Sequence, residues 1–254
     1  MRRREPEPSQ SLEMLLRSLH LAAFAAQHAE VVARAEQHGW TLSQCLRELC
    51  ELELTERQRR RIERLLKSSV LPREKTLANF DSTRLTTKVR RQVPTLCEGG
   101  FVDRADNILA FGLPGRGKTH LLCGIGHELV QRGYAVLFTP AYRIVQRLVA
   151  AKRELTLERE LRRLDGFDAV LIDDIGYVQQ DREEMEVLFT FLAERYERRS
   201  VMITSNLVFS KWDQIFKDPL TTMAAIDRLV HHATILEFDG ESVRAQKAKA
   251  RQPG

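Results

Sequence analysis

Two patterns of hydrophobic positions divide the chain. Over residues 9–67, apolar side chains recur at three- and four-residue intervals, as in amphipathic helices. Gly39 ends the first helical stretch, and Thr41 with Gln44 has the spacing of a capping box that opens the second. We therefore expect a small all-helical N-terminal domain within residues 1–75. The pattern breaks over residues 67–84, which we interpret as a linker.

From about residue 105, short apolar runs alternate with helical stretches. The runs lie at 107–111, 135–138, 169–172, 201–204 and 234–238, and the helical stretches at 118–132, 141–164, 182–198 and 211–231. This alternation is typical of a parallel sheet with helices on both faces. The sequence therefore predicts an α/β domain with a five-stranded parallel sheet over residues 76–254.

The composition is that of a folded protein with a packed core, and the clustered positive charge suggests a polyanionic partner. The 254 residues are 43% hydrophobic, which is enough for a packed core, and the net charge is +5. Basic residues cluster at 2–4, 57–67 and 244–251. Such clusters are either solvated surface or contacts to a polyanion. The candidate DNA contacts in the second cluster are Arg57, Arg59, Arg60, Arg61 and Arg64.

Cysteines and apolar stretches indicate where the protein works. The four cysteines form no C-x-x-C pair and have no histidine at ligand spacing, so we expect reduced core residues and no disulfide or zinc site. The N-terminus lacks the apolar run of a signal peptide, and no stretch reaches the roughly 18 apolar residues of a membrane span. We expect a cytoplasmic protein without membrane contact. The paired His231 and His232 show no further ligand in the sequence and are interpreted as local structure.

The strongest motif is the stretch 112–119, which matches G-x-x-x-x-G-K-[ST] between an apolar strand and a helix. Its glycines let backbone N–H groups turn toward phosphates, and the helix directs its positive end at them. Lys118 can reach the β- and γ-phosphates, and the Thr119 hydroxyl can bind Mg²⁺. The sequence thus predicts a nucleotide site made of Gly112, Leu113, Pro114, Gly115, Arg116, Gly117, Lys118 and Thr119.

Polar residues that follow two later strands complete the predicted site. Asp173 and Asp174 end the apolar run of "DAVLIDDIG", where α/β sheets bind ligands. In P-loop enzymes the first carboxylate serves Mg²⁺ and an acidic neighbour polarises the attacking water, although two aspartates can also merely cap a turn. The next apolar run ends in Thr204, Ser205 and Asn206. A polar side chain at that tip could orient the water, with Asn206 as the candidate, or the residues could form a plain Ser-Asn turn.

These motifs together resemble the AAA+ ATPases of the IstB type. The segments "GLPGRGKTHLL", "VLIDDIG", "ITSN", "DRLVHH" and "GESVR" follow that family in order and spacing, and the N-terminal helical segment is also similar. The resemblance implies a bacterial, ATP- and Mg²⁺-dependent helper of transposition, related to DnaC helicase loaders and more distantly to DnaA. It implies a protein that oligomerises on DNA, remodels it and recruits a transposase.

The resemblance also assigns roles to single residues. It makes Asp173 the magnesium-side carboxylate, Asp174 the catalytic one, and Asn206 the sensor on the fourth strand. It makes Arg228 the arginine finger that reaches into the neighbouring subunit's site. Most AAA+ proteins have glutamate where this chain has Asp174, so the shorter side chain distinguishes its site from theirs.

Two further expectations come from the resemblance. The helices at 141–164 stand where initiator-type members carry a helical element that faces DNA, so Lys152 and Arg153 are additional candidate DNA contacts. Only 16 residues follow the run at 234–238, so we expect no C-terminal helical lid, as in IstB and DnaC types. Arg244 is a candidate replacement for a lid arginine.

Three functions remain open on sequence grounds. A transposition helper would bind double-stranded DNA largely without sequence preference, a cognate transposase, and copies of itself in a ring or helical oligomer. A DnaC-like replicative helicase loader would share the ATPase core, but its N-terminal domain would bind a helicase. A metabolic P-loop kinase would need neither Arg228 nor the basic clusters. The resemblance favours the first.

Overall fold

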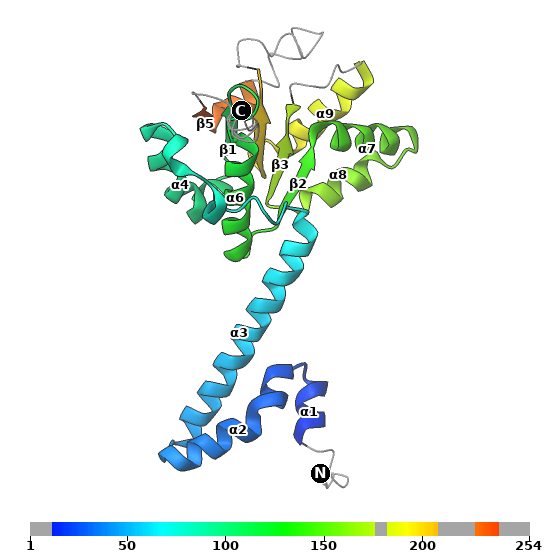
Figure 1. Ribbon diagram of the computed structural model, residues 1–254. Coiled ribbons are helices and arrows are strands. Elements are labelled where there is room, and N and C mark those ends of the chain that lie inside the picture. Colours follow the sequence, from blue (N-terminus) through cyan, green and yellow to red (C-terminus); the bar gives the residue numbers. More distant parts are fainter. Residues whose placement is uncertain (1–11, 176–181, 208–226, 239–254) are drawn as a thin grey trace, which may run out of the picture. The chain divides into compact units, whose positions relative to one another are not determined.

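The computed structural model describes residues 12–175, 182–207 and 227–238 (Figure 1). The chain forms two compact units, residues 1–63 and residues 64–254. The sequence-based division between residues 75 and 76 stays a prediction. In the described parts of the chain, no helix combines the length and the apolar character needed to cross a membrane.

The first unit is all-helical, as expected, and contains one break that was not expected. Its helices are α1 (Leu12–Ser18), α2 (Ala22–His38) and the first part of α3 (Leu42–Ser69). The single helix predicted before Gly39 is two helices, because His20 between them adopts a left-handed φ of 58°. Gly39 ends α2 with a φ of 63°, and the capping box is confirmed by a 2.7 Å bond from Thr41 N to Gln44 Oε1.

A buried glutamate joins the helices of this unit. Glu53 is only 5% exposed, and its Oε2 accepts hydrogen bonds from the N–H groups of Ala23 and Phe24 at the start of α2. Its Oε1 accepts from Arg57 Nε at 2.9 Å, and Arg57 also donates to His20 O. Burial alone would raise the pKa of Glu53, but the bonds from Arg57 and the two N–H groups lower it below its ordinary value. The side chain therefore caps α2 from α3.

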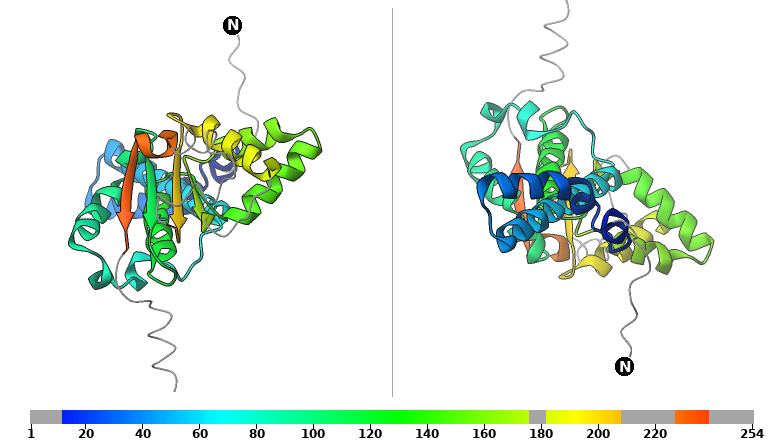
Figure 2. Two further views of the ribbon diagram at one scale, coloured as in Figure 1. Left: turned by 90° about the horizontal axis from the view of Figure 1, so that it is seen from above. Right: turned by 90° about the horizontal axis from the view of Figure 1, so that it is seen from below.

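The second unit contains the predicted parallel sheet (Figure 2). Its strands are parallel wherever they pair and run in the order β2-β3-β4-β1-β5. The five strands are β1 (Asn107–Phe111), β2 (Val136–Pro140), β3 (Ala169–Asp173), β4 (Ser200–Ser205) and β5 (Ala233–Glu237). Because β4 lies between β1 and β3, the carboxyl ends of these three strands meet at one edge of the sheet.

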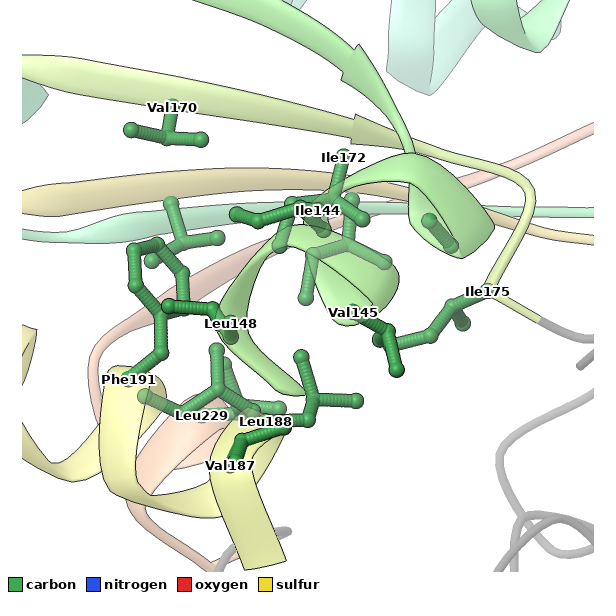
Figure 3. Packing of buried hydrophobic residues seen from close by; sticks show 14 of the residues in the cluster. Ile144, Val145, Leu148, Val170, Ile172, Ile175, Val187, Leu188, Phe191 and Leu229 are labelled. Carbon is green, nitrogen blue, oxygen red and sulfur yellow. The ribbon is translucent and has the colours of Figure 1, made fainter. Parts of the chain in front are cut away.

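Helices cover both faces of the sheet, because successive strand residues point to opposite sides. On one face α7 (Ala141–Arg153) and α9 (Arg182–Arg195) pack onto the strands with α8 (Leu157–Asp165) beside them, and Figure 3 shows Leu148, Ile172 and Phe191 in this layer. On the other face lies α6 (Lys118–Gln131). The stretch 141–164 is two helices, with a turn at Leu155, whose φ is 57°. Of the helix expected over 211–231, the structure describes residues 227–231, which are helical.

The interpretation of residues 67–84 as a linker is wrong for most of the segment. After the end of α3, Leu71 and Leu77 pack onto α6 where Gly126 and Gly124 leave room; a Cβ at Gly124 would lie 2.6 Å from the Leu77 side chain. Thr76 O and Pro72 O lie within hydrogen-bond distance of His120 and His127 on α6. The short 3₁₀ turns η1 (Leu77–Asn79) and η2 (Ser82–Arg84) belong to this layer, which α4 (Thr87–Glu98) and α5 (Gly100–Asp103) continue toward β1.

Candidate nucleotide-binding site

Most of the predicted site residues of the α/β domain meet around one cavity. The loop 112–117 connects β1 to α6, Asp173 ends β3, and Asn206 follows β4. They line a cavity of about 530 Å³ at the carboxyl edge of the sheet. Its walls are formed by Lys75, Asn79, Phe80, Asp81, Arg84, Pro114, Gly115, Arg116, Gly117, Lys118, Thr119, His120, Asp173, Asp174, Thr204 and Asn206.

The loop has the backbone of a phosphate cradle. Gly112, Gly115 and Gly117 have φ angles of 148°, 80° and 91°, a region that favours glycine. A Cβ at Gly112 would lie 2.4 Å from Phe238 O, and one at Gly117 would lie 3.0 Å from the Phe80 ring. Arg116 Nη1 donates to Phe238 O at 3.1 Å, which ties the loop to the residue after β5. The loop therefore fits a polyphosphate that is bound by backbone N–H groups.

Lys118 is held inside this loop. It is only 6% exposed, and its Nζ donates to Gly112 O, to Leu113 O at 3.0 Å and to Asn206 Oδ1 at 2.8 Å. These contacts place the ammonium charge at the first turn of α6, beside the loop glycines. That is where the terminal phosphates of a bound nucleotide would need a cation.

Asp173 and two hydroxyl groups form an oxygen cluster beside the loop. Asp173 Oδ1 accepts from Thr119 Oγ1 at 2.6 Å and from Thr204 Oγ1 at 2.7 Å. Mg²⁺ prefers oxygen ligands such as carboxylates and hydroxyls, so this cluster fits the ion that accompanies ATP. The sequence predicted Thr119 and Asp173 as the residues on the Mg²⁺ side, and it offered Thr204 only as one of three polar residues at the end of its strand.

Asp174 and Asn206 form a second polar group on the same edge. The backbone of Asp174 has a left-handed φ of 66°, and its N–H donates to Thr204 Oγ1 at 2.8 Å. Its carboxylate accepts a short hydrogen bond from Asn206 Nδ2. Because Asn206 Oδ1 also accepts from Lys118, this one amide connects the cation of the loop with the second aspartate.

One wall of the cavity was missed by sequence reasoning. It comes from the segment interpreted as a linker, through Lys75, Asn79, Phe80, Asp81 and Arg84. Phe80 packs edge-to-face on the His120 ring at a centroid distance of 5.2 Å. The available signal in the sequence was the "FD" pair at residues 80–81.

Arg228 lies at the opposite edge of the sheet. It is exposed, in the helical turn 227–231 directly before β5. Asn107, the first residue of β1, donates its Nδ2 to Leu229 O and its N–H to His232 O, which fixes this turn at the amino ends of the strands. A strand advances about 3.3 Å per residue, so the length of β5 separates Arg228 from the cavity of its own chain. The structure does not bring Arg228 together with Lys118.

The candidate DNA contacts are exposed, except for the half-buried Lys152, and several are engaged in ion pairs within the chain. Arg59 pairs with Glu56 and Glu63, and Arg60 also pairs with Glu56. Exposed pairs of this kind contribute little to stability because water and salt screen them, so a phosphate can replace the carboxylate at small cost.

The other candidates are distributed over both units. Lys152 pairs with Glu186 at 2.8 Å and Arg153 with Glu183 at 2.7 Å, which connects α7 to α9. Arg57 differs from them, because it supports the cap on α2. The remaining two, Arg61 and Arg64, are exposed on α3. Arg244 and the question of a lid concern residues after 238, outside the part of the chain that the structure describes.

The fold and the cavity define a P-loop ATP-binding protein of the AAA+ class. The chain belongs to the family described as IstB-like ATP binding protein, which matches residues 14–251. It is 42% identical over 238 residues to a protein of Sinorhizobium fredii named for ATP binding in an insertion sequence, covering 93% of this chain and 80% of that one. A similarly named protein of Pseudomonas aeruginosa is 36% identical over 238 residues, covering 94% and 90%.

Solved structures confirm the fold at lower identity. The replication initiator DnaA bound to AMPPCP and single-stranded DNA is similar with a TM-score of 0.57 and 23% identity, covering 71% of this chain and 56% of that one. DnaI is similar with a TM-score of 0.54 and 22% identity, covering 68% and 94%. At these identities the likeness establishes the AAA+ core.

Proposed function

We propose that this protein is a DNA-stimulated ATPase that helps an insertion sequence to transpose. The observation that carries the proposal is the single cavity in which the loop glycines, Lys118, the Thr119–Asp173 pair and Asp174 meet. The ATP-binding family supports the nucleotide, and the insertion-sequence names of the relatives support the process.

The residues of the cavity suggest how ATP would be hydrolysed. Backbone N–H groups of the loop and the Lys118 ammonium bind the phosphates, while Thr119 and Asp173 would hold Mg²⁺, which neutralises their charge. The Asp174 carboxylate accepts a proton from water as its oxygen attacks the γ-phosphorus, and the bond to ADP breaks to release ADP and phosphate. Asn206 positions Asp174 relative to Lys118.

The distance of Arg228 from its own cavity supports a site shared between subunits. An arginine at the amino edge of the sheet can stabilise a γ-phosphate only if that phosphate is bound by another copy of the chain. We therefore infer a ring or helical oligomer in which each chain supplies Arg228 to its neighbour. Oligomers of this kind on double-stranded DNA would present α3 and the α7–α8 turn to the phosphate backbone.

Capture of partners tests the function directly. The immobilised bait is the transposase encoded beside this protein's gene, bound to DNA. In the presence of Mg²⁺ and ATP the protein should be retained on this bait. Double-stranded DNA should also stimulate its hydrolysis of ATP. Lys118→Ala should lose the stimulated turnover, whereas Lys88→Ala, an exposed lysine of α4, should keep it. Retention by a replicative helicase without retention by the transposase would identify a helicase loader. Turnover that DNA does not change would contradict the DNA-stimulated ATPase.

A further inference from the structure

Three metal-ligand side chains meet outside the nucleotide site. Glu197 lies in the turn after α9, His231 ends the helical turn before β5, and His232 follows it. Each brings one donor atom within 4.8 Å of the other two. The two imidazole rings have a centroid distance of 4.2 Å, and His232 Nε2 lies 3.8 Å from Glu197 Oε1. The paired histidines, interpreted from the sequence as local structure, therefore have a third candidate ligand.

The surroundings of this cluster resemble those of a metal site in two respects. All three side chains are exposed, so an ion can reach them and they can rotate. The Tyr196 hydroxyl lies 3.1 Å from His231 Nδ1 and orients that ring. A ligating histidine commonly donates the N–H of its second ring nitrogen to an oxygen, which fixes the ring and its tautomer, and the Tyr196 hydroxyl oxygen can accept such a bond from His231 Nδ1.

We propose that Glu197, His231 and His232 bind a zinc ion. Two neutral imidazoles and one carboxylate are a ligand set that zinc accepts, with water in the fourth position. Ligand atoms of tetrahedral zinc lie about 3.3 Å apart, so exposed side chains that now lie within 4.8 Å need only small rotations. Mg²⁺ prefers an octahedral oxygen shell, so the ion that accompanies ATP does not compete effectively here.

Zinc bound here would connect the turn after α9 with the turn that contains Arg228. Glu197 follows α9, while the histidines follow Arg228 by three and four residues. Glu197 supplies the negative charge of the three ligands. A bound ion would hold the turn of Arg228 against the end of α9.

Zinc binding to the full chain tests the proposal. We would measure zinc binding by equilibrium dialysis with Zn²⁺ in excess Mg²⁺. All variants carry Cys50→Ser, because Cys50 is exposed and its thiolate could bind zinc itself. In this background the protein should bind zinc, and a variant with His231→Gln and His232→Gln should lose that binding. Glu197→Gln should weaken it by more than about tenfold and Tyr196→Phe by about tenfold.

A matched control removes two histidines elsewhere, through His28→Gln and His38→Gln in the helical unit. It should bind zinc as the Cys50→Ser background does. Circular dichroism checks that each variant is folded, and Glu197→Gln, an exposed change, provides the result if the double variant does not fold. Zinc affinity that is unchanged by the loss of His231 and His232, or by Glu197→Gln, would overturn the proposal.

Discussion

At the residue scale, Asn206 shows how the site couples its charged groups. Its amide accepts from Lys118 with one atom and donates to Asp174 with the other. A phosphate that draws Lys118 toward itself would therefore alter the position of Asp174. This connection explains why a short polar side chain follows β4 at this point.

Lys118 and Asp174 should fail in different ways when replaced. Lys118→Ala removes the cation for the terminal phosphates and should weaken ATP binding by at least about tenfold. Asp174→Asn keeps the size of the side chain but cannot accept the proton, so ATP should bind normally while hydrolysis stops. Titration with a fluorescent ATP analogue and an assay of phosphate release measure the two steps. Normal nucleotide binding by Lys118→Ala would show that the loop is not the ATP site.

Glu53 should make the stability of the helical unit depend on pH. Its folded pKa is lowered, so its contribution is complete above the unfolded pKa of about 4.3 and is lost as pH falls through the folded pKa. Glu53→Gln replaces the buried charged acceptor of three hydrogen bonds with a neutral amide and should cost about 1–3 kcal/mol. Hydrogen exchange of the α2 amides, followed from neutral pH downward, measures both effects.

The control for this prediction is Glu51→Gln, an exposed change on the same helix. It should leave the exchange of the α2 amides and its pH dependence as in the wild type. Equal protection of the α2 amides in Glu53→Gln and wild type at neutral pH would show that Glu53 does not stabilise this unit.

At the scale of elements, the first part of α3 holds the helical unit together, and we propose that the arginines after it contact DNA. Glu53 and Arg57 hold the helical unit together, and the arginines that follow are exposed. If Arg59, Arg60 and Arg61 each contact a phosphate, changing all three to glutamine should reduce the slope of log K against log salt by about 2.7. Fluorescence anisotropy of labelled duplex DNA over a salt series measures this slope.

The matched control changes three exposed arginines of the other unit, Arg73, Arg91 and Arg132, which gives the same net charge. Its slope should stay at the wild-type value. A wild-type slope in the triple α3 variant would show that the three arginines do not contact DNA and are only solvated surface residues.

The elements also show what sequence alone could establish. The strands were predicted within one or two residues, because each is a short apolar run bounded by polar residues. The meeting of Thr119 with Asp173 was predictable, since parallel strands bring their carboxyl ends to one edge.

Other features had no local signal. The packing of residues 70–84 on α6 depends on the small volume of Gly124 and Gly126, which in the sequence resemble ordinary helix positions. The turn at His20 needs a left-handed residue where no glycine stands. Glu197 is 34 residues before His231, so no ligand spacing pointed to the pair.

At the scale of the whole molecule, β5 connects the two ends of the proposed mechanism. The turn with Arg228 leads into its amino end, and Phe238 after its carboxyl end touches Gly112 and Arg116 of the phosphate loop. A neighbouring chain that contacts Arg228 would therefore lie at the start of β5. The other end of the same strand reaches the phosphate loop of the chain that carries this Arg228.

The central claim is that ATP hydrolysis needs two chains, and mixing two inactive variants tests it most directly. Arg228→Ala lacks the arginine and Asp174→Asn lacks the proton acceptor, so each should be nearly inactive alone, on DNA as in solution. In an equal mixture with random assembly, about a quarter of the interfaces regain both groups. We expect phosphate release to return in the mixture, under the conditions in which the protein oligomerises on DNA. A mixture that stays as inactive as its parts, although exchange of subunits between them is demonstrated, would contradict the claim.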